Sequence, residues 1–468
     1  MPFAESDSAP PMTIPHNVLW RIFAAAVAIR WLYSLTLLMT MGREGLMGAD
    51  SHGYLAQAEH LAANALQGSL HNWDWLGSDL GVMPMMPWLL GLHVALFGQL
   101  APLTYVLLQG LLDAGVCLLI YGIAGALDRR FALPTAIAAT VNPTQIVLSG
   151  LVYTDVPFVF FVALFLYGSV RWLRAPSWSW AILIGTGLGG AALVRIMIVP
   201  WVPVLAVFLL GLLLIRRKLL FRHVAQVAAA VAIFCVCIGP VLARNVIQYG
   251  SWSLTSQGGG HLALWVVPLV REAKEHTPWA QGAADVDKLY QARFGSAANN
   301  PFENSRRYAE IGREELRKLG LPAVIKAWTV GAVINLASPA IILSPPIAQL
   351  PRMGFYATPG QSTMDKIASL LFRSDNALYA WMLLAGIAGV AVVRLIQLLG
   401  AVTILRLGGD WSIAALLVLW AGFVLAVNGP IASPKYRLPI EPVLMVLAGA
   451  GIARFCSRWN TRPSQASR

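Results

Sequence analysis

The sequence has little charge and little cysteine for a chain of 468 residues. Asp, Glu, Lys and Arg make up only 12% of it, whereas hydrophobic residues make up 57% and the mean hydropathy is +0.65. These values lie outside the range of ordinary globular domains. Apolar runs of about 20 residues, each long enough to cross a bilayer, recur along the chain. The composition therefore excludes a soluble multidomain protein and predicts an all-α polytopic membrane protein.

The scarcity of cysteine excludes a disulfide framework. Cys117, Cys235, Cys237 and Cys456 lie inside or at the edges of apolar runs. They form no zinc motif, and Cys235 and Cys237 sit too close along a helix to bridge well. The N-terminus also lacks the basic start and small-residue cleavage site of a signal peptide. We therefore expect the run from Val18 to about Thr40 to remain as the first span.

Basic residues exceed acidic ones and give a formal charge of +12. They gather in short segments between apolar runs, at 128–130, 171–174 and 216–222, which favours membrane orientation by the positive-inside rule over nucleic-acid binding. With these segments in the cytoplasm, residues 41–102 form a first outer loop. Further spans are expected at about 103–125, 131–149, 154–173, 180–196, 198–215, 222–243, 322–345, 376–399, 411–428 and 438–456.

Two elements of the first outer loop are expected at the membrane surface. A span at 84–102 would invert every later loop, so this short, proline-bracketed run is predicted to be interfacial or re-entrant. A helix from Tyr54 to about Leu66 carries an apolar stripe and is predicted to lie flat on the bilayer. The same charge argument makes 322–345 re-entrant or interfacial. We divide the chain into a transmembrane module at 1–243, a periplasmic loop region at 244–321, and C-terminal transmembrane helices with a cytoplasmic tail at 322–468.

Polar residues collect at the outer ends of several predicted helices. Asp50, Asp155, Arg244, Lys435 and Arg437 all occupy such positions. Carboxylates there can act as acids or bases, and guanidinium and ammonium groups can bind phosphate. Helix capping by either aspartate and snorkelling by the basic residues are the alternatives.

Two charges fall well inside apolar runs. Asp113 and Arg195 are expected either to pair with each other or, for Arg195, to line a substrate cavity. The segment "QGGGHLAL" follows no strand, so it is not a nucleotide loop, and it is read as a turn that brings His261 to the cavity.

The order of these segments resembles the GT-C superfamily of polyprenyl-phosphate-sugar-dependent glycosyltransferases, and within it the branch of protein mannosyltransferases and aminoarabinose transferases. The resemblance rests on "ADSHGYLAQAEHL", "NPTQIVLSGLVYTDVPFVFF", "GPVLARNVIQYGSWSLTSQGGGHLALW" and "SPKYRLPIEPVLMVLAGAG". It implies a GT-C type bundle of about 11 transmembrane helices with interfacial helices in the first outer loop.

The resemblance also implies roles for individual residues. Asp50 is expected to be the catalytic base. Many relatives have a second acid directly after it, where this chain has Ser51, so Asp155 is chosen as the second acid over Glu59, Asp74 and Asp79. The donor phosphate is assigned to Arg244, Lys435 and Arg437, and the substrate cavity to Tyr54, Arg195 and His261.

The predicted activity is inverting transfer of a hexose or pentose from a polyprenyl-phosphate donor to an envelope glycan, lipid or protein. The reaction is placed at the periplasmic face of the inner membrane. Some relatives hold a metal, so a divalent cation is possible, but His52, His71 and His261 show no ligand spacing. The alternative is a transporter or flippase of lipid-linked sugars. Such a protein is expected to have paired halves and a site at mid-bilayer, and no repeat is visible in this sequence.

Overall fold

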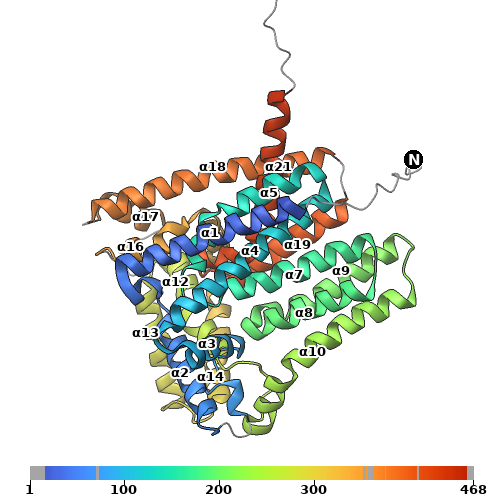
Figure 1. Cartoon of the computed structure of the whole chain (residues 1–468). Coiled ribbons are helices and arrows are strands. Elements are labelled where there is room, and N and C mark those ends of the chain that lie inside the picture. The colour runs from blue at the N-terminus through green and yellow to red at the C-terminus, as the bar shows by residue number, and fades with distance from the viewer. Residues whose placement is uncertain are drawn as a thin grey trace, which may run out of the picture.

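The computed structural model describes residues 16–69, 73–351, 355–356, 358, 363–374, 376–407 and 410–460. Within these ranges the regular secondary structure is entirely helical. The long helices of the bundle are α1 (His16–Met41), α4 (Ala101–Leu127), α7 (Asp155–Arg174), α8 (Trp178–Val194), α9 (Trp201–Ile215), α10 (Phe221–Tyr249), α15 (Leu321–Ala337), α18 (Ala377–Leu407), α19 (Trp411–Asn428) and α21 (Glu441–Asn460). In Figure 1, α1, α4, α7, α8 and α9 lie roughly side by side, whereas α10 runs at an angle below them and α21 rises across α18 at the top.

In the described ranges, eight helical stretches are long and apolar enough to cross a membrane, or ten if each of two bent pairs counts as one span. This confirms a multi-pass, all-α membrane protein, and the number of about 11 spans stays a prediction. One bent pair is α5 (Arg129–Thr140) with α6 (Pro143–Ser149), at 46°. The bend falls where Asn142 caps α6 and Pro143 starts it, since proline suits a first helical turn and not an interior one.

A layer of shorter helices covers one end of the bundle, and we call it the end layer. It contains α2 (Ser51–Leu66), α3 (Met85–Phe97), α11 (Gly258–His261), α12 (Val267–Glu275), α13 (Trp279–Phe294) and α14 (Pro301–Leu319). Ion pairs between exposed side chains cover α14, including Arg293–Glu314 at 2.9 Å, as expected for a solvated face. At its C-terminus α14 turns by 103° into α15.

Most of the apolar stripe of α2 faces protein, although Leu66 at its end is 73% exposed. Leu55, Ala58 and Leu61 are buried, and Gly91 of α3 lies directly against Ala58 and Leu61. The prediction that this stripe rests on lipid is therefore wrong: α3 supplies a closer apolar surface. This packing fixes α2, and with it Asp50, to the rest of the chain.

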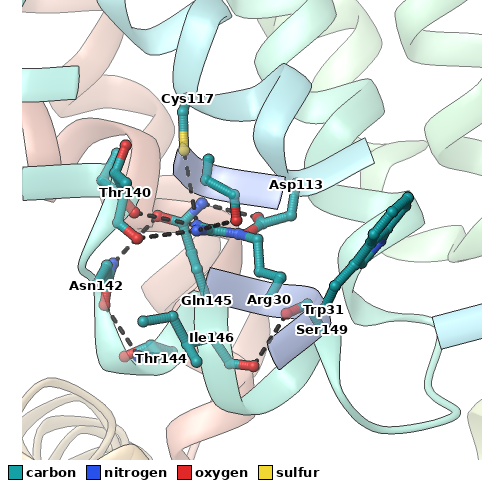
Figure 2. A network of polar contacts seen from close by, with 12 residues as sticks. Arg30, Trp31, Asp113, Cys117, Thr140, Asn142, Thr144, Gln145, Ile146 and Ser149 are labelled. Atoms are coloured by element: carbon teal, nitrogen blue, oxygen red, sulfur yellow. Dashed lines mark hydrogen bonds and ion pairs between the residues drawn. The ribbon is translucent and has the colours of Figure 1, made fainter. Parts of the chain in front are cut away.

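A buried polar network ties the centre of the bundle together (Figure 2). Arg30 of α1 donates to Asp113 of α4 at 2.5 Å, and both side chains are 0% exposed. Gln145 donates to the other Asp113 oxygen at 2.8 Å, and Arg30 also donates to the Thr140 carbonyl at 2.8 Å. The expectation that Asp113 pairs with Arg195 is therefore wrong, because α1 provides a nearer cation that the sequence alone did not single out.

Candidate functional site

Four helix ends meet where the bundle joins the end layer. Asp50 directly precedes α2, Asp155 is the first residue of α7, and Arg195 directly follows α8. Lys435 lies in the short helix α20 (Pro434–Arg437), which leads through a tight turn into α21. The chain thus brings together charged residues that are up to 385 positions apart.

Asp50 forms an ion pair with Lys435. The Lys435 ammonium donates to Asp50 Oδ2 at 2.7 Å. The Asp50 side chain is 46% exposed, whereas that of Lys435 is 19% exposed. Asp50 makes no side-chain capping bond to α2, so its position before the helix does not use its carboxylate. One carboxylate oxygen therefore has a fixed cation and the group as a whole remains open to a substrate.

Asp155 and Arg195 form a second and more enclosed pair. Arg195 Nη2 lies 2.8 Å from Asp155 Oδ2, and the two side chains are 19% and 2% exposed. Arg195 also donates through Nε and Nη2 to the Thr154 hydroxyl, at 3.0 and 2.8 Å. Asp155 likewise makes no capping bond, since Thr154 is the residue at the N-cap. The pair fixes the guanidinium plane and leaves Arg195 Nη1 without a hydrogen bond to any described residue.

Tyr54 lies near both ion pairs. It is one turn into α2, and all four charged groups of the pairs influence the pKa of its hydroxyl. Burial raises the pKa of Tyr54, Arg195 opposes this shift, and the carboxylates of Asp50 and Asp155 reinforce it. The Tyr54 hydroxyl is therefore protonated at neutral pH and can donate a hydrogen bond to an anionic oxygen.

The loop that carries Asp50 is locked to the loop that carries Asp155. The Ser51 hydroxyl donates to the Val152 carbonyl at 2.8 Å, and the Ala49 N–H donates to the Tyr153 hydroxyl at 2.9 Å. A Cβ on Gly48 would lie 2.1 Å from that Tyr153 oxygen, so only glycine permits this approach. The two aspartates are therefore held by one rigid unit and not by independent loops.

Three other residues predicted for the site lie outside this cluster. Arg244 is buried in α10 and donates to Asn245 Oδ1 and to the Gly77 carbonyl, both at 3.0 Å. Arg437 is buried and donates to Glu441 at 2.7 Å, to the Ser338 carbonyl at 2.7 Å and to the Thr144 hydroxyl at 2.8 Å. His261 lines a separate pocket in the end layer. Both arginines tie parts of the fold together in this structure.

Aromatic residues that the sequence reading missed complete the cluster. The Lys435 ammonium lies 5.4 Å from the ring centroid of Tyr153 and 5.5 Å from that of Tyr436, distances typical of cation–π contacts. Their signal was present in the sequence, because "VYTD" and "PKYR" place each tyrosine beside a chosen charged residue. The predicted site was chosen from charged residues, and these two tyrosines were not assigned to it.

The side chains of this cluster are not arranged as ligands of a metal ion. Each carboxylate of the cluster already has a cationic partner, Lys435 for Asp50 and Arg195 for Asp155. Among the described residues, no three His, Cys, Asp or Glu side chains converge as metal ligands would. His71 of the predicted histidine set lies outside the described residues.

Part of this chain matches a known protein family, and its fold is similar to that of solved structures. Residues 82–243 match the family of dolichyl-phosphate-mannose-protein mannosyltransferases. No curated protein matches the chain. The solved structure of the oligosaccharyltransferase AglB from the archaeon Archaeoglobus fulgidus, with an inhibitory peptide and a dolichol-phosphate, is similar over 95% of this chain and 50% of its own, at 14% identity and a TM-score of 0.55.

Two further solved structures are similar. The apo form of the Archaeoglobus fulgidus oligosaccharyltransferase matches over 92% of this chain and 50% of its own, at 16% identity and a TM-score of 0.51. ArnT from Cupriavidus metallidurans, bound to undecaprenyl phosphate, matches over 94% and 79%, at 17% identity and a TM-score of 0.40. This chain spans about half the length of the oligosaccharyltransferase chains. The family match and the shared helical arrangement confirm the resemblance to the GT-C superfamily, whose fold this chain has.

Proposed function

We propose that this protein is an inverting glycosyltransferase. It transfers a hexose or pentose from a polyprenyl-phosphate donor to a hydroxyl of an envelope glycan, lipid or protein. The observation that carries the proposal is the convergence of Asp50, Lys435, Asp155, Arg195 and Tyr54 at one end of a GT-C bundle. One half-exposed carboxylate lies beside two cations and a phenol, which is the set that such a reaction requires.

Asp50 is the general base. The acceptor O–H gives its proton to the Asp50 carboxylate, the acceptor oxygen forms a bond to the anomeric carbon, and the bond from that carbon to the phosphate oxygen breaks. The polyprenyl phosphate leaves with the electron pair, and the configuration inverts because attack and departure occur on opposite faces. Asp50 suits this role better than Asp155, because it is 46% exposed and Asp155 only 2%.

Lys435 and Arg195 stabilise the leaving phosphate. Negative charge grows on that group during bond cleavage, and fixed cations and donors lower the energy of the transition state. Lys435 is held by Asp50 and two tyrosine rings, and Arg195 is held by Asp155 and Thr154 with Nη1 free for an anionic oxygen. Of the three predicted phosphate ligands, we therefore assign this role to Lys435 and add Arg195.

The enclosed Asp155 positions Arg195 and does not touch the substrate. Its Oδ1 is buried and has no hydrogen-bond partner among the described residues. Tyr54, which lies near both ion pairs, donates a hydrogen bond to the phosphate. The positive segments that are expected in the cytoplasm support a position of this end of the bundle at the periplasmic face of the inner membrane. A lipid-borne donor and an acceptor from the aqueous side can both reach a site at such an end.

Substitution of Asp50 tests the proposal. Asp50→Asn keeps the shape and removes the base, so transfer from a synthetic polyprenyl-phosphate sugar should fall by about 10²–10⁴-fold. Glu59→Gln is the matched control, because Glu59 lies on α2, the helix that follows Asp50, is 55% exposed and pairs with the exposed Arg43 at 3.8 Å. Transfer by Asp50→Asn at the rate of Glu59→Gln would remove the base assignment. A wild-type protein that consumes no lipid-linked donor would remove the proposed function.

A further inference from the structure

A second polar pocket lies in the end layer, apart from the charged cluster. We call it the His261 pocket. It has a volume of about 230 Å³ and is lined in part by Gln257, His261, Trp265, Asn304, Ser305 and Tyr308. These residues come from the start of α11, the π-helical turn at Leu262–Val266, and α14.

The close contact of two helices shapes this pocket. The Gly259 N–H donates to the Ser305 hydroxyl at 2.9 Å, and a Cβ on Gly259 would lie 1.7 Å from the Ser305 carbonyl oxygen. Only glycine allows α11 to approach α14 so closely. The middle one of the three glycines before His261 is thereby explained as a packing requirement, and this close approach brings the imidazole to the pocket wall.

The polar lining of the His261 pocket is uncharged. His261 is exposed at the pocket wall, and desolvation by the surrounding protein lowers the pKa of its imidazole, which favours the neutral form with one donor and one acceptor. The side chains of Gln257 and His261 make no hydrogen bond to any described residue, so both keep their full capacity for a ligand. Neutral donors and acceptors match hydroxyl groups, whereas a phosphate or carboxylate ligand would call for arginine or lysine.

Trp265 gives the pocket a fixed aromatic wall. Its ring is 37% exposed and rests against Trp279, with centroids 4.6 Å apart. Tyr356 supports Trp265 from another side at 5.9 Å. A rigid, half-exposed indole face suits the C–H face of a sugar ring, which is apolar on that face and hydroxylated at its edge. Neutral hydrogen-bonding groups beside such a face form a site for a carbohydrate.

Two chains of contacts connect this pocket to Asp50 and Lys435. On one side, the Ser256 N–H donates to the Leu80 carbonyl at 2.8 Å, and Gln57 of α2 donates to Asp79 in the same loop at 2.9 Å. On the other side, the Tyr356 hydroxyl accepts from the Ala432 N–H and donates to the Ala432 carbonyl, both at 2.9 Å.

Ala432 is three residues before Lys435, and α2 begins directly after Asp50. The pocket is therefore held to both members of the catalytic ion pair.

We infer that the His261 pocket binds a neutral sugar unit of the acceptor, while a hydroxyl of the acceptor is presented to Asp50. This inference rests on the proposed function and narrows the acceptor to a glycan or glycolipid. Trp265 packs on the sugar ring, and Gln257 and His261 hydrogen-bond its hydroxyls.

Saturation-transfer NMR on the full chain in lipid nanodiscs tests the inference. The probes are methyl glycosides of neutral hexoses and N-acetylhexosamines, compared with glucose 6-phosphate and methyl glucuronide. Neutral glycosides should give signals that fall at least about fivefold in Trp265→Ala and in Gln257→Ala, since each removes a direct contact. Trp252→Ala, at a tryptophan that is 78% exposed and outside the pocket, should leave the signals unchanged.

The inference is overturned if no neutral glycoside binds, if the anionic sugars bind better, or if both variants with wild-type thermal stability keep the signals. Donor consumption by the wild-type protein is measured separately. Its absence overturns the proposed function, whereas donor consumption without a sugar-binding effect of the variants overturns this inference alone.

Discussion

Removing the carboxylate of Asp113 should destabilise the whole bundle. Asp113 and Arg30 are both 0% exposed and pair at 2.5 Å (Figure 2). Asp113→Asn keeps the shape of the side chain but leaves the Arg30 guanidinium buried without a counter-charge. Breaking a buried pair from one side costs about 3–5 kcal/mol. Arg30 keeps carbonyl acceptors at Thr140, 2.8 Å, and Ala139, 3.2 Å, so we expect the lower end of that range.

The double variant Arg30→Met with Asp113→Leu should recover at least half of this loss. It removes both charges together, and apolar replacement of a complete buried pair is often neutral or stabilising. Some loss should persist because Gln145, which donates to Asp113 at 2.8 Å, then lacks its acceptor. The assay is reversible unfolding of the purified protein by denaturant in one detergent, which gives the free energy of unfolding.

Glu310→Gln provides the control for charge removal as such. Glu310 pairs with Arg293 on the end layer, where the two side chains are 44% and 43% exposed, and such pairs contribute at most about 1 kcal/mol. The reasoning is refuted if Asp113→Asn costs no more than Glu310→Gln, or if the double variant is less stable than the single one.

Three further predictions concern the site. Lys435→Gln should raise the KM for donor at least about tenfold, because a charged hydrogen bond to phosphate is worth about 1.5–3 kcal/mol, and donor titration that shows an unchanged KM would exclude Lys435 from phosphate binding. Gly48→Ala should lower kcat without unfolding the protein, since its Cβ would displace Tyr153 and shift Asp50; single-turnover kinetics at wild-type rates would contradict this. Burial raises the pKa of Tyr153 to about 12, so the contribution of this shift to stability is complete below pH 10 and is lost as the pH rises from 10 to 12. In Tyr153→Phe, the fall in the free energy of unfolding between pH 9 and 11 should therefore be smaller by about 1 kcal/mol. An identical fall in both proteins would refute the raised pKa.

Much of the fold follows from the length of the apolar runs and from the polar or proline-containing segments that separate them. The predicted first span at 18–40 is found as α1 (His16–Met41), and the predicted span at 411–428 coincides with α19. Such segments are predictable because a run of about 20 apolar residues has few alternatives to a helix in a bilayer. Tertiary packing is less predictable, and for that reason the apolar stripe of α2 was assigned to lipid when its partner is α3.

The sequence predicted which helix ends carry the charged residues of the site, but it did not predict which of these residues form ion pairs with each other. Asp50, Asp155 and Lys435 were chosen because charges at membrane boundaries are rarely accidental, and the structure brings them together. Arg244 and Arg437 satisfy the same sequence criterion, yet each is used by neighbouring carbonyl and side-chain acceptors. Which acceptors lie within reach of a guanidinium depends on helix rotation and crossing, and neither quantity is encoded in a local pattern.

The serine directly after Asp50 holds the Asp50 loop in place. Ser51 is 0% exposed, and its hydroxyl both donates to the Val152 carbonyl at 2.8 Å and accepts from the Gly48 N–H at 2.7 Å. A carboxylate at this position would face a carbonyl oxygen in an enclosed space, with no donor for that contact and a cost of burial. The hydroxyl instead locks the Asp50 loop to residue 152, three positions before Asp155. The bond from Ser51 to Val152 therefore helps to hold Asp155 and its partner Arg195 near Asp50, the proposed base.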